Sequence, residues 1–249
     1  MKTVAWFAIA LLCVGSGVLA QPAATEGRTD SQVLVEWLLD EDRDLRGIPF
    51  GDVIQATSGH PVLAYDPGNA AQREVLNHIA TAMETLLIQL NAPSHPVHQS
   101  GRINEASSHF EETLHVLLDA DPELECDFPK TADGSAQRSG YPDLRIAHPK
   151  SGVVFYLDPK LYATDSRESS FRTFYFEPKR ATNKVGEPAI HLIAGISHNG
   201  KAENGAWQFT GWSLVDLSKF RVQLKAEFQA GNRDLYLDEL IIAESETKP

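Results

Sequence analysis

Gly140-Tyr141-Pro142-Asp143-Leu144-Arg145-Ile146 and Val153-Val154-Phe155-Tyr156-Leu157-Asp158-Pro159-Lys160 are the segments that decide the fold of this 249-residue chain. Their alternating apolar residues predict two strands, and the proline- and glycine-containing run 148–152 predicts the tight turn that joins them. In an antiparallel hairpin the start of the first strand lies beside the end of the second. We therefore expect the carboxylates of Asp143 and Asp158 to converge.

Lys160 adds a cation to this pair of acids. It follows Asp158 by two positions, so both side chains lie on the same face of the strand. Two carboxylates and water suit Mg²⁺, which prefers hard oxygen ligands, and the backbone carbonyl of Pro159 is free to join them. A metal in this place would activate water and neutralise charge on a phosphate. The hairpin thus predicts a metal-dependent phosphodiesterase in which the lysine stabilises the attacking hydroxide.

The order of these residues resembles a known family. Pro142-Asp143 followed by Asp158-Pro159-Lys160 is similar to the signature of the PD-(D/E)xK restriction-endonuclease-like superfamily. A helix before the hairpin usually contributes a glutamate in that family, and Glu111 matches it best, with Glu105 as the second choice. The resemblance covers roughly residues 100–230.

The resemblance implies a fold, a reaction and a cofactor. The fold would be α/β (α+β), with a central mixed β-sheet flanked by helices and an N-terminal helical extension. The reaction would be hydrolysis of DNA with Mg²⁺ (or Mn²⁺). The expected catalytic residues are Asp143, Asp158, Lys160 and Glu111, and the expected metal ligands are both aspartates, Glu111 and the Pro159 carbonyl. The chain departs from the family pattern at Pro159, because proline within a strand is expected at edges or irregular places.

Basic residues cluster after the hairpin, between Lys160 and Lys184. Arg172, Lys179 and Lys184 belong to a polar and basic stretch with aromatic residues between, and they are our candidates for phosphate contacts on either side of the cleavage point. The alternative is an ordinary solvated strand and loop. For the hairpin itself, the alternative is an exposed ion pair between Asp158 and Lys160 with no catalytic role.

Periodicity predicts the remaining elements. Apolar stripes at helical spacing favour helices over residues 31–45, 70–91, 104–119 and 217–229. Alternation favours strands near residues 124–128, 144–147, 153–157, 172–176, 190–196 and 207–214. Seven glycines and prolines predict that residues 47–68 are mostly loop. Cys126, in the first of these strands, is expected to be buried rather than reactive.

The N-terminus predicts export. Lys2, an apolar run over residues 4–12 and small residues before Gln21 are typical of a signal peptide cleaved after Ala20, so we expect a secreted or periplasmic protein. An uncleaved anchor is the alternative; otherwise we expect no membrane contact. The predicted organisation is a signal peptide (1–20), a leader and helical extension (21–100) and a nuclease-like core (101–249). Oligomeric state is left open.

The net charge of −12 opposes non-specific binding of nucleic acid. A second hypothesis therefore stays beside the nuclease. The chain would be a non-catalytic secreted protein that keeps a nuclease-like fold and binds a partner. Binding of a divalent cation would separate the two hypotheses, because only the nuclease requires it.

Overall fold

A computed structural model describes residues 28–39, 45–170, 173–225 and 227–243, and the predicted signal peptide lies outside them. The chain divides into two compact units, residues 1–43 and 44–249, which we treat separately. The first contains α1 (Asp30–Leu39). Thr29 caps this helix, because its hydroxyl accepts from the Gln32 amide while the Gln32 side chain accepts from the Thr29 amide.

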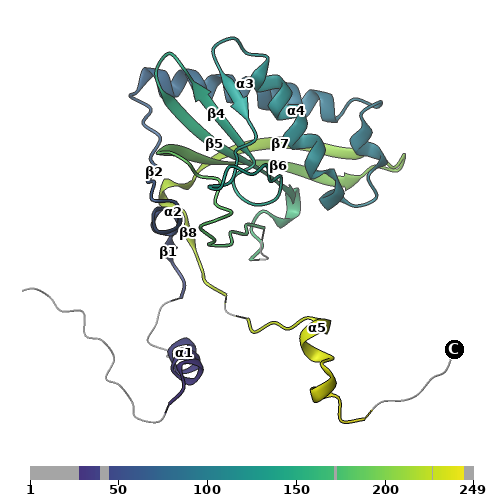
Figure 1. Cartoon of the computed structure of the whole chain (residues 1–249). Coiled ribbons are helices and arrows are strands. Elements are labelled where there is room, and N and C mark those ends of the chain that lie inside the picture. The colour runs from purple at the N-terminus through teal and green to yellow at the C-terminus, as the bar shows by residue number, and fades with distance from the viewer. Residues whose placement is uncertain (1–27, 40–44, 171–172, 226, 244–249) are drawn as a thin grey trace, which may run out of the picture. The chain divides into compact units, whose positions relative to one another are not determined.

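The second unit is built on a six-stranded mixed sheet (Figure 1). Its spatial order is β2-β6-β5-β4-β3, and β7 also pairs with β6. Strand β6 runs parallel to β2 and β5, whereas the β3–β4, β4–β5 and β6–β7 pairs are antiparallel. The strands are β2 (Val62–Leu63), β3 (Glu125–Asp127), β4 (Leu144–His148), β5 (Val153–Ala163), β6 (Ala189–Lys201) and β7 (Trp207–Asp216).

Two helices cover one face of this sheet (Figure 1). They are α3 (Ala70–Leu90) and α4 (Ser107–Asp119), both predicted from their apolar stripes. The short 3₁₀ turn η2 (Ile103–Ala106) leads into α4. Their buried residues form one cluster with alternate residues of the strands, including Leu144 and Leu157. This central mixed sheet flanked by helices confirms the predicted restriction-endonuclease-like fold.

The other face carries a second, smaller core. It gathers Phe50 and Ile54 of α2 (Phe50–Ser58) with Tyr156 of β5 and Leu217. Below it, β1 (Ile48–Pro49) pairs with β8 (Arg221–Val222) in a separate two-stranded sheet. The remaining short elements are η1 (Pro96–Gln99), η3 (Thr164–Ser166), η4 (Leu217–Lys219), α5 (Asn232–Leu235) and η5 (Asp238–Leu240).

Three local predictions were wrong. Residues 47–68 are not mostly loop, because Pro49 and Gly59 mark the two ends of α2. No α-helix covers the described part of residues 217–229, where the short 3₁₀ turn η4 is followed by β8, which pairs with β1. The described residues 173–176 are irregular rather than a strand. Each error concerns a segment whose structure depends on a distant partner or on a boundary residue.

Two further expectations concern chemistry and membranes. Cys126 is buried in β3, as predicted, and burial raises the pKa of its thiol to about 12. This keeps the sulfur protonated and unreactive at neutral pH. Across the described ranges, no helix combines the length and apolar character that a membrane crossing requires.

Candidate active site

The β4–β5 hairpin has the predicted geometry. Leu144 pairs with Leu157 and His148 with Val153, and Gly152 closes the turn with a positive φ of 71°. Asp143 precedes the first of these pairs and Asp158 follows it, so the two acids lie at the same end of the hairpin. Leu144 and Leu157 point into the helix-covered core, and the alternation of side chains turns Asp158 to the opposite face.

Lys160 joins the two carboxylates. Its ammonium contacts Asp158 Oδ2 directly, lies 3.9 Å from Asp143 Oδ2 and donates to the Pro159 carbonyl at 3.4 Å. The contact with Asp158 is an ion pair without hydrogen-bond geometry. The buried Oδ2 atom therefore has no hydrogen-bond partner in the described structure. Asp158 itself is only 2% exposed.

Pro159 fits its strand because β5 outlasts β4. The β4 ladder ends at Leu157, whereas β5 stays paired with β6 as far as Ala163. From residue 158 onward β5 is therefore paired on one edge only, with β6. A proline is tolerated at such an edge position, since no ladder donor is required there. The same open edge lets side chains from both faces of β5 reach one cavity.

That cavity has a volume of about 500 Å³. We call it the acidic cavity. It is lined by Ser107, Phe110, Glu111, Arg138, Ser139, Gly140, Asp143, Pro159, Lys160, Leu161 and Thr173. Helix α4 thus brings the predicted glutamate to the hairpin acids. Arg138 Nη2 pairs with Glu111 Oε2 at 3.2 Å.

The acids influence one another's protonation. Burial, and next the charge of Asp158, raise the pKa of Asp143 to about 8. Burial also raises the pKa of Glu111, although Arg138 opposes the shift. Two adjacent carboxylates repel each other when both are ionised, and a bound cation offsets this repulsion. The Asp158 Oδ2 atom, which lacks a hydrogen-bond partner in the described structure, and the other hard oxygen donors therefore fit a divalent metal ion.

The three predicted substrate contacts have different positions. Lys184 is 3% exposed, and burial lowers the pKa of its ammonium. The negative charges of Asp143, Asp158 and Glu111 oppose this shift. Such burial favours a role beneath the acids, and contact with substrate stays a prediction. Lys179 lies on an exposed segment and pairs with Glu177 at 2.7 Å. Arg172 lies outside the described residues.

Arg138 is the residue that sequence reasoning missed. Its guanidinium contacts Glu111, lies 3.8 Å from Glu112 and stacks 3.7 Å above the centre of the Phe128 ring. Its position five residues before Asp143 was the available signal. No local pattern distinguishes it from an ordinary surface arginine, because its partners come from α4 and from the segment after β3.

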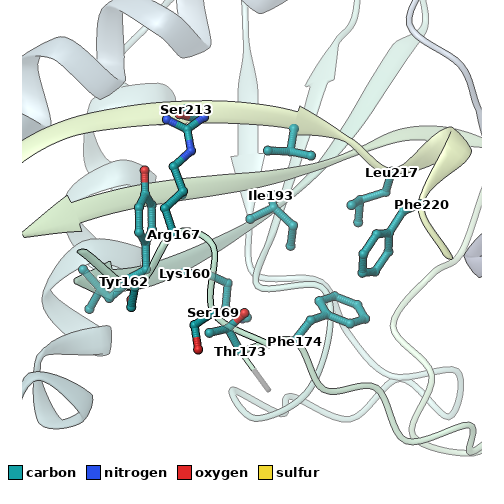
Figure 2. A pocket seen from close by; sticks show the side chains of 14 residues that line it. Lys160, Tyr162, Arg167, Ser169, Thr173, Phe174, Ile193, Ser213, Leu217 and Phe220 are labelled. Atoms are coloured by element: carbon teal, nitrogen blue, oxygen red, sulfur yellow. The ribbon is translucent and has the colours of Figure 1, made fainter. Parts of the chain in front are cut away.

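A second cavity lies on the other side of Lys160 (Figure 2). Its volume is about 280 Å³, and it shares Lys160, Leu161 and Thr173 with the acidic cavity. Figure 2 shows two contrasting ends: Ile193, Phe174, Leu217 and Phe220 form an apolar side, whereas Tyr162, Arg167 and Ser213 lie at the other. Lys160 thus stands between an acidic and a largely apolar space.

One other cluster could hold a metal ion. In the described structure, ligand atoms of Glu74, His78 and Glu123 lie within 4.8 Å of one another. His78 is also 2.5 Å from Asp121. This group lies beyond the C-terminal end of α4, at the opposite end of that helix from the acidic cavity. The histidine already links α3 to the segment after α4, which explains the cluster without an ion.

Comparison with known proteins identifies the family. The family model "Type II restriction enzyme MjaV family" matches residues 43–239. The chain belongs to this family. It is also 28% identical over 211 residues to the Type II restriction enzyme MjaV of Methanocaldococcus jannaschii, covering 81% of this chain and 90% of the relative. Membership of a restriction enzyme family confirms the prediction of an enzyme, an endodeoxyribonuclease-like hydrolase.

Proposed function

We propose that this member of the MjaV family is a Mg²⁺-dependent (or Mn²⁺-dependent) endonuclease that hydrolyses DNA at a PD-(D/E)xK site. One observation carries the proposal: the contact of Lys160 with Asp158, beside Asp143, at a cavity that also contains Glu111. The relative from M. jannaschii is a Type II restriction enzyme. We extend this activity to the present chain and expect cleavage at a defined sequence.

The metal would be held by Asp143, Asp158 and the Pro159 carbonyl, with Glu111 completing or supporting the shell. When bound, a divalent ion supplies charge neutralisation of the scissile phosphate and a more acidic water. The protein supplies the positions of the reacting groups. Asp143 must lose its proton to serve as a ligand, and burial beside Asp158 makes that loss unfavourable until a cation enters.

Lys160 has the most direct role in the reaction. Its ammonium lies between the acids, where it can donate a hydrogen bond to a water oxygen and stabilise the hydroxide as a proton leaves. The hydroxide oxygen forms a bond to phosphorus as the ester bond breaks, and the leaving oxygen takes up a proton from solvent. Leu161 and Pro159 line the same space and limit the water around the ammonium.

Cleavage of plasmid DNA tests the proposal. Purified protein with Mg²⁺ or Mn²⁺ should cut the plasmid, and Asp158→Ala or Lys160→Ala should lower the rate at least a hundredfold. Lys150→Ala is the matched control, since Lys150 is an exposed lysine in the β4–β5 turn, at the opposite end of the hairpin from the two acids. Undiminished cleavage by both active-site variants would exclude this site. Sequencing of the cut ends would test for a defined recognition sequence.

The non-catalytic hypothesis makes the opposite forecast. A binding protein with a nuclease-like fold would neither cut DNA nor release heat on titration with millimolar Mg²⁺. Both negative results together would favour it over the nuclease.

We also propose that the mature chain acts outside the cytoplasm, as a secreted or periplasmic protein. Support comes from the N-terminal sequence alone, with Lys2, the apolar run over residues 4–12 and Ala20 before the cleavage point. Mass spectrometry of the protein from separated cell fractions tests this. A cytoplasmic protein that retains Met1 would contradict it.

A further inference from the structure

Arg138 lies at the mouth of the acidic cavity and has no role in the reaction described above. It lines the acidic cavity and also a neighbouring one, where it is accompanied by the hydroxyl-bearing residues Ser107, Ser108 and Ser139. Its side chain is 48% exposed, against 32% for Lys160. Arg138 is thus the more accessible of these two cavity cations, whereas Lys184 is buried.

Different contacts hold the position of Arg138 and neutralise its charge. The guanidinium lies over the face of Phe128, and that ring is stacked on the His115 imidazole, with centroids 4.5 Å apart and an interplanar angle of 10°. These stacked rings fix the arginine through its flat face. The edge of the guanidinium, which carries the N–H donors, faces Glu111 and Glu112. It can therefore exchange one oxyanion for another while the stacking stays intact.

We propose that Arg138, with the hydroxyls of Ser107, Ser108 and Ser139, binds a phosphate of the DNA strand beside the one that is cleaved. This inference rests on the proposed function. A guanidinium forms paired hydrogen bonds with phosphate as it does with carboxylate, and serine hydroxyls are common donors to phosphate oxygens. Glu112 is 63% exposed and can turn away into water when the phosphate enters.

The local charges support an exchange in which Arg138 leaves Glu111 and binds a phosphate. The cavity region contains the acids Glu111, Asp143 and Asp158 and the cations Lys160, Lys184 and Arg138. The carboxyl of Asp143 is largely protonated at neutral pH because its pKa is about 8, but Glu112 beside Arg138 adds a further negative charge. Three charged acids therefore balance the three cations, and the region has no excess positive charge for an incoming polyanion. Arg138 can offer that charge only by leaving Glu111. The incoming phosphate would take the place of the Glu111 carboxylate at the edge of the guanidinium.

Binding without cleavage provides the test. A labelled plasmid fragment that the wild-type enzyme cuts is titrated with protein in EDTA at several salt concentrations. We expect Arg138→Met to weaken binding about tenfold and to reduce the slope of log K against log[salt] by about 0.9, the value for one lost phosphate contact. Arg138→Lys should restore the slope but only part of the affinity, because lysine lacks the paired donors.

Arg73→Met is the matched control. Arg73 is an exposed arginine that donates to the Pro67 carbonyl at the start of α3, and its removal should leave affinity and salt slope unchanged. Thermal unfolding of each variant checks that the fold is intact, and Arg138→Lys keeps the test valid if the methionine variant is unstable. Wild-type affinity and slope in Arg138→Met would overturn this inference while leaving the nuclease proposal standing. A wild-type protein that neither binds nor cuts DNA would overturn both.

Discussion

Asp143 is a largely buried acid whose environment differs strongly from water. Its carboxyl lies beside that of Asp158, and its pKa rises from 3.8 to about 8 in the folded protein. The folded state therefore binds a proton more tightly than the unfolded state. Stability from this residue is complete below pH 3.8 and is lost as the pH rises toward 8. His191 has the opposite effect at lower pH, because burial lowers its pKa to about 4.

These two shifts predict a stability profile for the metal-free protein. Between pH 4 and 6.5 the two residues oppose each other, whereas from pH 6.5 to 8 the Asp143 effect remains and the free energy of unfolding falls by up to about 1.4 kcal/mol per pH unit. Asp143→Asn should flatten the profile above pH 6.5. Urea denaturation in EDTA at several pH values measures it, and an equal slope in the variant would exclude Asp143 as the source.

The Tyr141–His191 pair beneath the site explains the histidine's behaviour. His191 is fully buried, its Nδ1 atom lies 2.7 Å from the Tyr141 hydroxyl, and its Nε2 atom has no hydrogen-bond partner in the described structure. An imidazolium would leave a buried N–H donor unsatisfied, so the neutral ring is preferred. The uncharged Tyr141–His191 pair therefore adds no charge next to Asp143 and Asp158.

At the scale of elements, the unequal lengths of β4 and β5 create the site. Strand β5 continues beyond the end of the β4 ladder, and the unpaired edge exposes Pro159, Lys160 and Leu161 to the acidic cavity. A full-length β4 would fill this space with its own backbone. The edge also makes the proline ring dispensable, because only its carbonyl is assigned to the metal.

Pro159→Ala tests this view of the edge. We expect the free energy of unfolding to change by less than about 1 kcal/mol and DNA cleavage to stay within a few-fold of wild type, because the carbonyl remains and an edge position needs no particular donor. Chemical denaturation and the plasmid assay measure the two quantities. A large loss of activity with normal stability would show that the ring itself positions the strand.

The same scale shows what sequence could and could not predict. The hairpin and the two helices of the main core were predictable, because alternation and helical periodicity are local. Helix α2 was missed because Pro49 and Gly59, which bound it, were treated as loop residues. The pairing of Val222 with Ile48 joins segments far apart in the chain, and no local pattern reveals it. Arg138 escaped for the same reason.

The whole molecule carries a net charge of −12, yet its family acts on a polyanion. The balanced charges around the acidic cavity reduce the conflict, and a bound divalent ion would make that region positive. Affinity for DNA would then depend on the ion as well as on the protein. This dependence follows from the chain's charge rather than from any one residue.

Ion binding should also stabilise the whole fold. With Mg²⁺ at ten times its dissociation constant, we expect about 1.4 kcal/mol of stabilisation, seen as a higher midpoint of thermal unfolding. Asp158→Asn should remove the effect. Glu123→Gln, which alters the separate His78 cluster, should retain it. If the glutamine variant loses the stabilisation and the asparagine variant keeps it, the ion binds at the wrong end of α4 for catalysis.

The β4–β5 turn has a consequence for how this gene can change. The length of this turn sets the pairing register, so one codon inserted within residues 149–152 that shifted β4 by one residue against β5 would turn Asp143 to the helix-covered side. The β6–β7 ladder already contains register shifts after Ser197 and His198. Codons can therefore be gained or lost in that second connection with far less harm, and length variation should be concentrated there.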